Sequence, residues 1–264
     1  MLKNSIKKRT IKSGMLRDPE MGITPGRKDS TMHNNDITLR TPLRFLESEN
    51  QDILKEGGFG AILARAGVGK TAFLIQIALD YLLMNRNVLY ISLNDPVEKV
   101  CLWYEEVYRN ISKSWDKKQA KDQWDSLLPY RFIMTFKVEG FTIPILEERL
   151  NDLTEQGVFS PHVLVIDGYP FDEPDEKNLS NLKNLVKQRS LKAWFTVRTH
   201  RHKEPGPDGM PVSLLTVKDL FDVIIQLQPI GSETHVNILK GATQTEGVPE
   251  LLLDPATLMV KNKS

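Results

Sequence analysis

A glycine-rich segment between an apolar run and a helical pattern constrains the fold of this chain more than any other feature. Residues 64–71, ARAGVGKT, match the pattern G-x-x-x-x-G-K-[ST] at every position except the first, where alanine replaces glycine. The apolar residues 60–63 predict a strand before the segment, and residues 70–83 predict a helix after it. This strand–loop–helix setting is typical of a phosphate-binding loop, although a glycine-rich turn without a ligand remains the alternative.

The loop motif predicts which groups would contact a bound phosphate and its metal ion. Backbone N–H groups of residues 66–71 would surround the β-phosphate, helped by the positive end of the following helix. Lys70 would reach the β- and γ-phosphates, and the Thr71 hydroxyl would bind Mg²⁺. The residues expected to contact a nucleotide are Ala64, Arg65, Ala66, Gly67, Val68, Gly69, Lys70, Thr71 and Ala72.

A second feature, an acidic residue at the end of an apolar run, follows about a hundred residues later. Residues 162–167, HVLVID, form an apolar run that ends at Asp167. Such a run predicts a buried strand, and a carboxylate at its end can hold the hydrated Mg²⁺ of a nucleotide. The alternative is an aspartate that only stabilises a turn.

The rest of the chain alternates short apolar runs with helical patterns, which favours a parallel sheet with crossover helices. Further strands are expected at 88–93, 131–136 and 193–197, and helices at 97–128, 144–156 and 178–186, with Gly157 as a stop signal. Short strands at 223–227, 236–240 and 251–253 predict a meander, after a Pro/Gly-rich loop at 203–213. The prediction is an α/β fold whose central, mostly parallel sheet is flanked by helices and followed by a C-terminal antiparallel meander. Aromatic residues between 103 and 124 favour a core over a base-stacking surface.

The net charge of +1 conceals an uneven distribution. Residues 1–40 contain nine Lys and Arg against four Asp and Glu, whereas the remaining residues have four more acids than bases. The first 40 residues also lack regular apolar periodicity, so we expect a basic, disordered arm before a domain at 41–264. The arm could contact nucleic acid or an acidic partner, or it could be a solvated tail.

Composition also bears on compartment and metal binding. No run of 18 apolar residues occurs, so no membrane span is expected. The single cysteine, Cys101, gives no disulfide framework and suits a reducing cytoplasm. His200 and His202 have no further His or Cys near them, which argues against a zinc-type site.

With the loop at 64–71 and Asp167, the chain resembles the RecA-like P-loop ATPases, in the branch that contains KaiC, the DnaB helicases and RadA. The resemblance covers residues 41–260 or so. It implies a RecA-like P-loop fold, ATP or ADP with Mg²⁺ as cofactors, and a homo-oligomer that could be a hexameric ring. The closing segment Leu253-Asp254-Pro255-Ala256-Thr257 is similar to the family phrase Phe-Asp-Pro-x-Thr-Gly.

The resemblance also identifies positions where this chain departs from the family. Residues 92–95, Ser-Leu-Asn-Asp, occupy the place where the family has a glutamate that activates water. Asn94 cannot act as a base, while Asp95 could do so through a shorter side chain. Asp95 could equally be the N-cap of the next helix.

Three further basic residues occupy positions that the resemblance implies. Arg198 stands where the family has a sensor glutamine and could still sense a γ-phosphate by its charge, and Arg201 stands where the family has an arginine. Alternatively, Arg198 and Arg201 pair with surface carboxylates. Lys240 corresponds to the lysine of a Lys-x-Arg finger that enters the neighbouring subunit's site, but no arginine follows it. The alternative for Lys240 is a solvated strand end.

Three functions remain open from the sequence. The chain could be an ATP-binding switch or assembly factor with weak or regulated hydrolysis, a ring motor on nucleic acid, or a scaffold that does not hydrolyse ATP. The missing glutamate, sensor amide and finger arginine favour the first over a fast motor, since loss of such groups typically costs orders of magnitude in rate.

Overall fold

The computed structural model describes residues 42–46, 52–172, 174–199, 206, 209–241 and 250–262. The arm expected at 1–40 lies outside the described residues, as do His200, Arg201, His202 and part of the loop at 203–213. No helix in the described ranges is long and apolar enough to cross a membrane.

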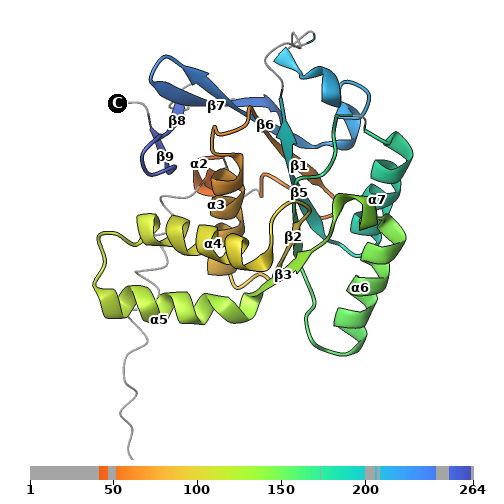
Figure 1. Cartoon of the computed structure of the whole chain (residues 1–264), viewed down its shortest axis with the longest axis horizontal. Helices are drawn as coiled ribbons and strands as arrows, with labels where there is room; N and C mark the ends of the chain where they lie inside the picture. Colours follow the sequence, from red (N-terminus) through yellow and green to blue (C-terminus); the bar gives the residue numbers. More distant parts are fainter. Residues whose placement is uncertain are drawn as a thin grey trace, which may run out of the picture.

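A nine-stranded sheet organises the described chain, in the order β3-β2-β4-β5-β1-β6-β7-β8-β9 (Figure 1). The strands from β3 to β6 in this order are parallel, and β7, β8 and β9 continue the sheet in antiparallel fashion. The bounds are β1 Phe59–Ala64, β2 Val88–Ser92, β3 Arg131–Thr135, β4 Val163–Asp167, β5 Lys192–Arg198, β6 Val223–Ile230, β7 Glu233–Lys240, β8 Leu251–Leu253 and β9 Val260–Asn262. The α/β class, the mostly parallel sheet and the antiparallel meander are therefore confirmed. The sequence analysis missed β9.

Helices cover both faces of the sheet, which explains why the central strands are apolar on both sides. On one face, α2 Pro42–Leu46, α3 Lys70–Leu83, α4 Val97–Ile111 and α5 Lys117–Leu127 contribute to one core cluster. On the other face, α6 Ile143–Glu155 and α7 Glu176–Gln188 contribute to a second cluster (Figure 1). The helical stretch expected at 97–128 is thus two helices, because the chain turns after Ile111 and Asp116 accepts a hydrogen bond from the Lys118 amide to begin α5.

Local sequence signals mark the ends of the other helices, which lie close to the residues predicted from the sequence. Gly157 adopts φ of 64° directly after α6, a left-handed conformation that glycine tolerates. Thr142 and Asp175 cap α6 and α7 through their side chains. The aromatic residues of α4 belong to the core, as expected, with Tyr104 and Tyr108 buried.

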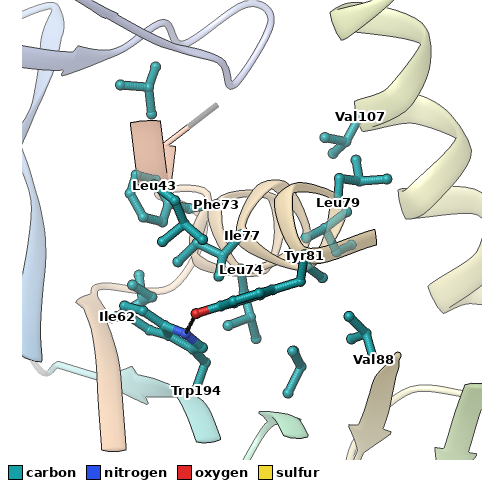
Figure 2. Close-up of a cluster of buried hydrophobic side chains, with 14 of the residues drawn as sticks. Leu43, Ile62, Phe73, Leu74, Ile77, Leu79, Tyr81, Val88, Val107 and Trp194 are labelled. Carbon is teal, nitrogen blue, oxygen red and sulfur yellow. Dashed lines mark hydrogen bonds between the residues drawn. The ribbon is translucent and has the colours of Figure 1, made fainter. Parts of the chain in front are cut away.

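The strands β1 and β5 and the helix α3 pack closely together below the loop that follows β1. Trp194 of β5 is fully buried beside Gly60 of β1, and its indole N–H donates to the Tyr81 hydroxyl of α3 at 3.3 Å (Figure 2). A Cβ added at Gly60 would lie 2.4 Å from the indole ring. Only glycine at this position lets the ring lie against β1, and α3 is anchored over the strand by the hydrogen bond to Tyr81.

Candidate functional site

The glycine-rich loop connects β1 to α3 at the carboxyl edge of the parallel strands. Gly67 has φ of 79° and Gly69 has φ of 106°, both in the left-handed region that side chains disfavour. A Cβ at Gly67 would meet nothing within 4 Å, so the space beside it is open. Gly69 serves as the N-cap of α3, and no side chain caps that helix end.

The backbone amides of this loop are available to an external acceptor. Among the described residues, none accepts a hydrogen bond from the N–H groups of Gly67 or of residues 69–72. The helix α3 begins at Lys70, so its positive end also points to this place. Unsatisfied donors at a helix N-terminus favour an anion, and phosphate oxygens are suitable acceptors.

Asp167, at the end of β4, is surrounded by three hydroxyl groups. Its Oδ2 accepts hydrogen bonds from Thr71 Oγ1 at 3.0 Å and from the Tyr90 hydroxyl at 2.9 Å. Its Oδ1 accepts a hydrogen bond from Thr196 Oγ1 at 2.5 Å. Three neighbouring elements thereby hold one carboxylate in a fixed orientation at the mouth of the loop.

Tyr90 and Thr196 were missed by the sequence analysis. They lie on β2 and β5, the two strands that flank β4, with Ser92 opposite Asp167 and Phe195 opposite Ile166. Their polar groups inside otherwise apolar strands are a signal in the sequence, but strand order is needed to direct them to Asp167. Burial raises the pKa of the Tyr90 phenol, and the charge of Asp167 raises it further, so Tyr90 keeps its proton and donates.

Thr71 and Asp167 suit an Mg²⁺ ion that is shared with phosphate oxygens. Mg²⁺ prefers oxygen ligands and is commonly bound by one or two carboxylates together with substrate phosphates and water. No group of three or more His, Cys, Asp or Glu side chains that could hold a metal occurs in the part of the chain that the structure describes. The Thr71 hydroxyl and the Asp167 carboxylate fit an Mg²⁺ ion whose remaining ligands are phosphate oxygens and water.

Lys70 lies inside the loop, where its ammonium donates a hydrogen bond to the Arg65 carbonyl at 3.1 Å. Burial lowers the pKa of Lys70; the charge of Asp167 opposes this, and that of Arg198 adds to it. Arg198 ends β5 opposite Ala64, and its side chain is exposed. The structure thus brings Lys70 and Arg198 together beside the loop, and a polyanion would relieve their mutual repulsion.

The two positions after β2 have different surroundings. The Asn94 amide lies over Gly168, where a Cβ would come within 2.1 Å of Asn94 Nδ2, so the exposed Asn94 is next to the end of β4. Asp95 forms an ion pair with Lys99 at 2.6 Å. The alternative that Asp95 caps α4 is wrong: the N-cap residue is Pro96, and no side chain forms a capping hydrogen bond at the start of this helix.

Lys240 does not reach the loop of its own chain. It pairs with Ile224 of β6, which is near the amino end of the parallel strands, whereas the loop follows their carboxyl ends. Its ammonium donates to the Lys218 carbonyl at 3.0 Å. Any contact of Lys240 with a nucleotide would therefore involve a neighbouring subunit's loop.

The segment after β8 packs against the loop, and this contact was not predicted. A Cβ at Gly69 would lie 3.1 Å from Leu253 and 3.3 Å from Leu258. The buried Gln76 of α3 donates to the Leu258 carbonyl at 2.6 Å and accepts from the Val260 amide at 3.4 Å. Leu258 has φ of 58° and stands at the glycine position of the family phrase noted above, which explains why a glycine would suit this turn.

The comparisons with protein-family models and with curated proteins identify no relative of this chain. No protein-family model matches the chain, and a search of curated proteins finds no match.

Proposed function

We propose that this protein binds ATP or ADP with Mg²⁺ in the loop at residues 64–72 and belongs to the RecA-like P-loop ATPases of the KaiC, DnaB and RadA branch. One observation carries the proposal. Thr71 and Asp167, which are 96 residues apart in the sequence, lie within 3.0 Å at the mouth of a loop whose amides are open to an acceptor. In P-loop NTPases, a Ser or Thr of the loop and an Asp of this kind hold Mg²⁺ together.

Each residue has a distinct part in holding the nucleotide. The loop amides and Lys70 bind the phosphates, Thr71 and Asp167 hold Mg²⁺, and Arg198 adds positive charge beside the loop. The metal ion, when bound, would neutralise phosphate charge. Tyr90 and Thr196 are positioning residues, because they fix the carboxylate of Asp167 rather than contact the ligand.

Hydrolysis is expected to be weak or regulated, which favours a nucleotide-dependent switch or assembly factor. Asn94 lies next to Gly168 and carries an amide that cannot accept a proton from water. Asp95 is paired with Lys99 through Oδ1, which leaves Oδ2 as the oxygen that could act as a base. Lys240 is left as a residue that could complete the site of a neighbouring subunit in an oligomer.

Nucleotide binding is tested directly with a fluorescent ATP analogue. Lys70→Ala should abolish binding, because it removes the ammonium that is proposed to bind the phosphates. Lys121→Ala is a matched control, since Lys121 is an exposed lysine of α5 that pairs with Asp125. Equal affinity of the Lys70→Ala and wild-type proteins would overturn the nucleotide site.

A turnover assay separates the proposed switch from the alternatives. A ring motor should hydrolyse ATP quickly and accelerate when single-stranded DNA is added, whereas a scaffold should show no turnover above that of Lys70→Ala. Asp95→Asn should lower turnover far more than affinity; unchanged turnover would remove Asp95 from the mechanism. Deleting residues 1–30 and measuring DNA binding at two salt concentrations tests the arm, because phosphate contacts weaken as salt rises.

A further inference from the structure

A cysteine, a tyrosine and an arginine form a cluster away from the nucleotide loop. Cys101 and Tyr104 are three residues apart on α4, so they share one face of the helix. Arg131, at the start of β3, packs against that face, with its Nη2 3.8 Å from Cys101 Sγ and its guanidinium 4.8 Å from the centre of the Tyr104 ring. Arg131 pairs with Val88, so the cluster lies toward the amino edge of the sheet, whereas the loop follows the carboxyl edge.

Two hydrogen-bonding groups in this cluster lack a partner. Across the ranges that the structure describes, the buried side-chain nitrogen and oxygen atoms without a hydrogen bond are Tyr104 OH and Arg131 Nη1. Buried polar groups are nearly always paired, so each exception requires an explanation. Here one exception belongs to Arg131, which contacts the sulfur of Cys101, and the other to Tyr104, which lies three residues from Cys101 on the same helix.

Both unpaired groups are donors. The guanidinium of Arg131 has only donors. Burial raises the pKa of the Tyr104 phenol, with the charges of Arg131 and Cys101 as smaller, opposing influences, so the hydroxyl keeps its proton. The cluster therefore offers two donors and lacks an acceptor.

The charge of Arg131 has no carboxylate beside it. Within the described residues it forms no ion pair, and it is held between the rings of Tyr104 and Trp124, the latter at 5.3 Å. Aromatic faces stabilise a guanidinium, but they accept no hydrogen bond from its in-plane N–H groups as an oxygen does. An oxygen atom attached to the neighbouring sulfur would supply the missing acceptor.

We propose that Cys101 is a site of reversible oxidation, at which hydrogen peroxide converts the thiol into a sulfenic acid that Arg131 and Tyr104 stabilise. The sulfur attacks one peroxide oxygen, an S–O bond forms and the O–O bond breaks. The sulfur loses two electrons, the peroxide is reduced, and the thiol proton leaves with the released oxygen as water. Cys101 is only partly buried, so peroxide can reach it, and Arg131 already lies against the sulfur that would carry the new oxygen.

The chain is well suited to a direct test because Cys101 is its only cysteine. The reduced full-length protein is treated with hydrogen peroxide, trapped with dimedone and measured by intact mass, so that every adduct reports on one sulfur. We expect the wild-type protein to form the adduct about tenfold faster than Arg131→Met, which keeps the length of the side chain and removes its charge. Cys101→Ser should give no adduct.

A second variant keeps the test informative if Arg131→Met fails to fold. Tyr104→Phe removes only a hydroxyl without a partner, so its urea midpoint should equal or exceed that of the wild type. Its sulfenic acid should pass on to the sulfinic acid several times faster, as followed by delayed addition of dimedone. Adduct formation within twofold of wild type in Arg131→Met, or an unchanged lifetime in Tyr104→Phe, would overturn the proposal.

Discussion

Replacement of Gly60 by alanine tests how the sheet supports the loop. Gly60 is the second residue of β1, four residues before the end of the strand, and its added Cβ would lie 2.4, 2.5 and 2.7 Å from three carbons of the Trp194 ring. These approaches are too short for carbon atoms, so the ring would have to move. Trp194 is fully buried and its N–H is held by Tyr81, which leaves it little room.

The size of the effect follows from these contacts. Inserting a methyl group into a filled core typically costs about 1–3 kcal/mol. If the ring moves, the hydrogen bond from Trp194 to Tyr81 is also weakened, which adds about 1 kcal/mol. We therefore expect Gly60→Ala to lower the free energy of unfolding by about 2–4 kcal/mol, a large fraction of the stability of an ordinary domain.

Urea unfolding followed by tryptophan fluorescence and circular dichroism measures this change. Gly140→Ala is the matched control, because Gly140 is exposed and a Cβ there meets nothing within 4 Å. The control should stay within about 0.5 kcal/mol of the wild type. A Gly60→Ala protein as stable as the control would show that β1 and β5 do not pack as closely as the structure indicates.

Four further changes follow from the geometry. Thr71→Ala should weaken Mg²⁺-dependent nucleotide binding by about tenfold or more while Thr71→Ser retains it, because the hydroxyl beside Asp167 is the proposed metal ligand; equal titrations would contradict this role. Asn94→Glu should raise the rate of phosphate release by about tenfold or more at similar affinity, since it places a carboxylate next to the end of β4; an unchanged rate would argue against this position. Because burial lowers the pKa of Lys70, nucleotide affinity should fall with rising pH before the ordinary pKa of 10.5 is reached. An affinity that does not change up to pH 10.5 would refute this prediction. Burial raises the pKa of Asp222, but hydrogen bonds from Lys183 and a backbone amide outweigh it, so the pKa lies below its ordinary value of 3.8 and the carboxylate stabilises the fold at neutral pH. That contribution is lost as pH falls below 3.8 and through the lowered pKa of the folded state. Asp222→Asn should therefore cost about 1 kcal/mol at pH 7 and less at about pH 3 in urea unfolding.

Local patterns were sufficient for most of the elements. The apolar runs that became β1, β2 and β4 have lengths and β-branched residues that favour buried strands, and the helices α3 and α6 begin and end near the residues expected. The short strand β9 was missed because three residues carry too little periodicity to be recognised. The helical stretch after β2 was divided by a turn that its amphipathic pattern did not reveal.

The candidate site shows the limit of such patterns. Lys70 and Thr71 follow from a contiguous motif whose chemistry depends on its own backbone. Asp167 was identified by its place at a strand end, but its contact with Thr71 is a tertiary one. Tyr90 and Thr196 could not be assigned, because their role depends on which strands flank β4.

The sequence by itself determined the alternation of strands and helices and the presence of a glycine-rich loop, since both arise from neighbouring residues and from local backbone preferences. Tertiary structure alone decided the strand order, and with it the meeting of three hydroxyl groups at Asp167. It also placed Lys240 at the opposite edge of the sheet from the loop and brought Leu253 and Leu258 against Gly69. The physical reason is that these contacts join segments far apart in the chain, and their position depends on how the layers bury apolar surface together.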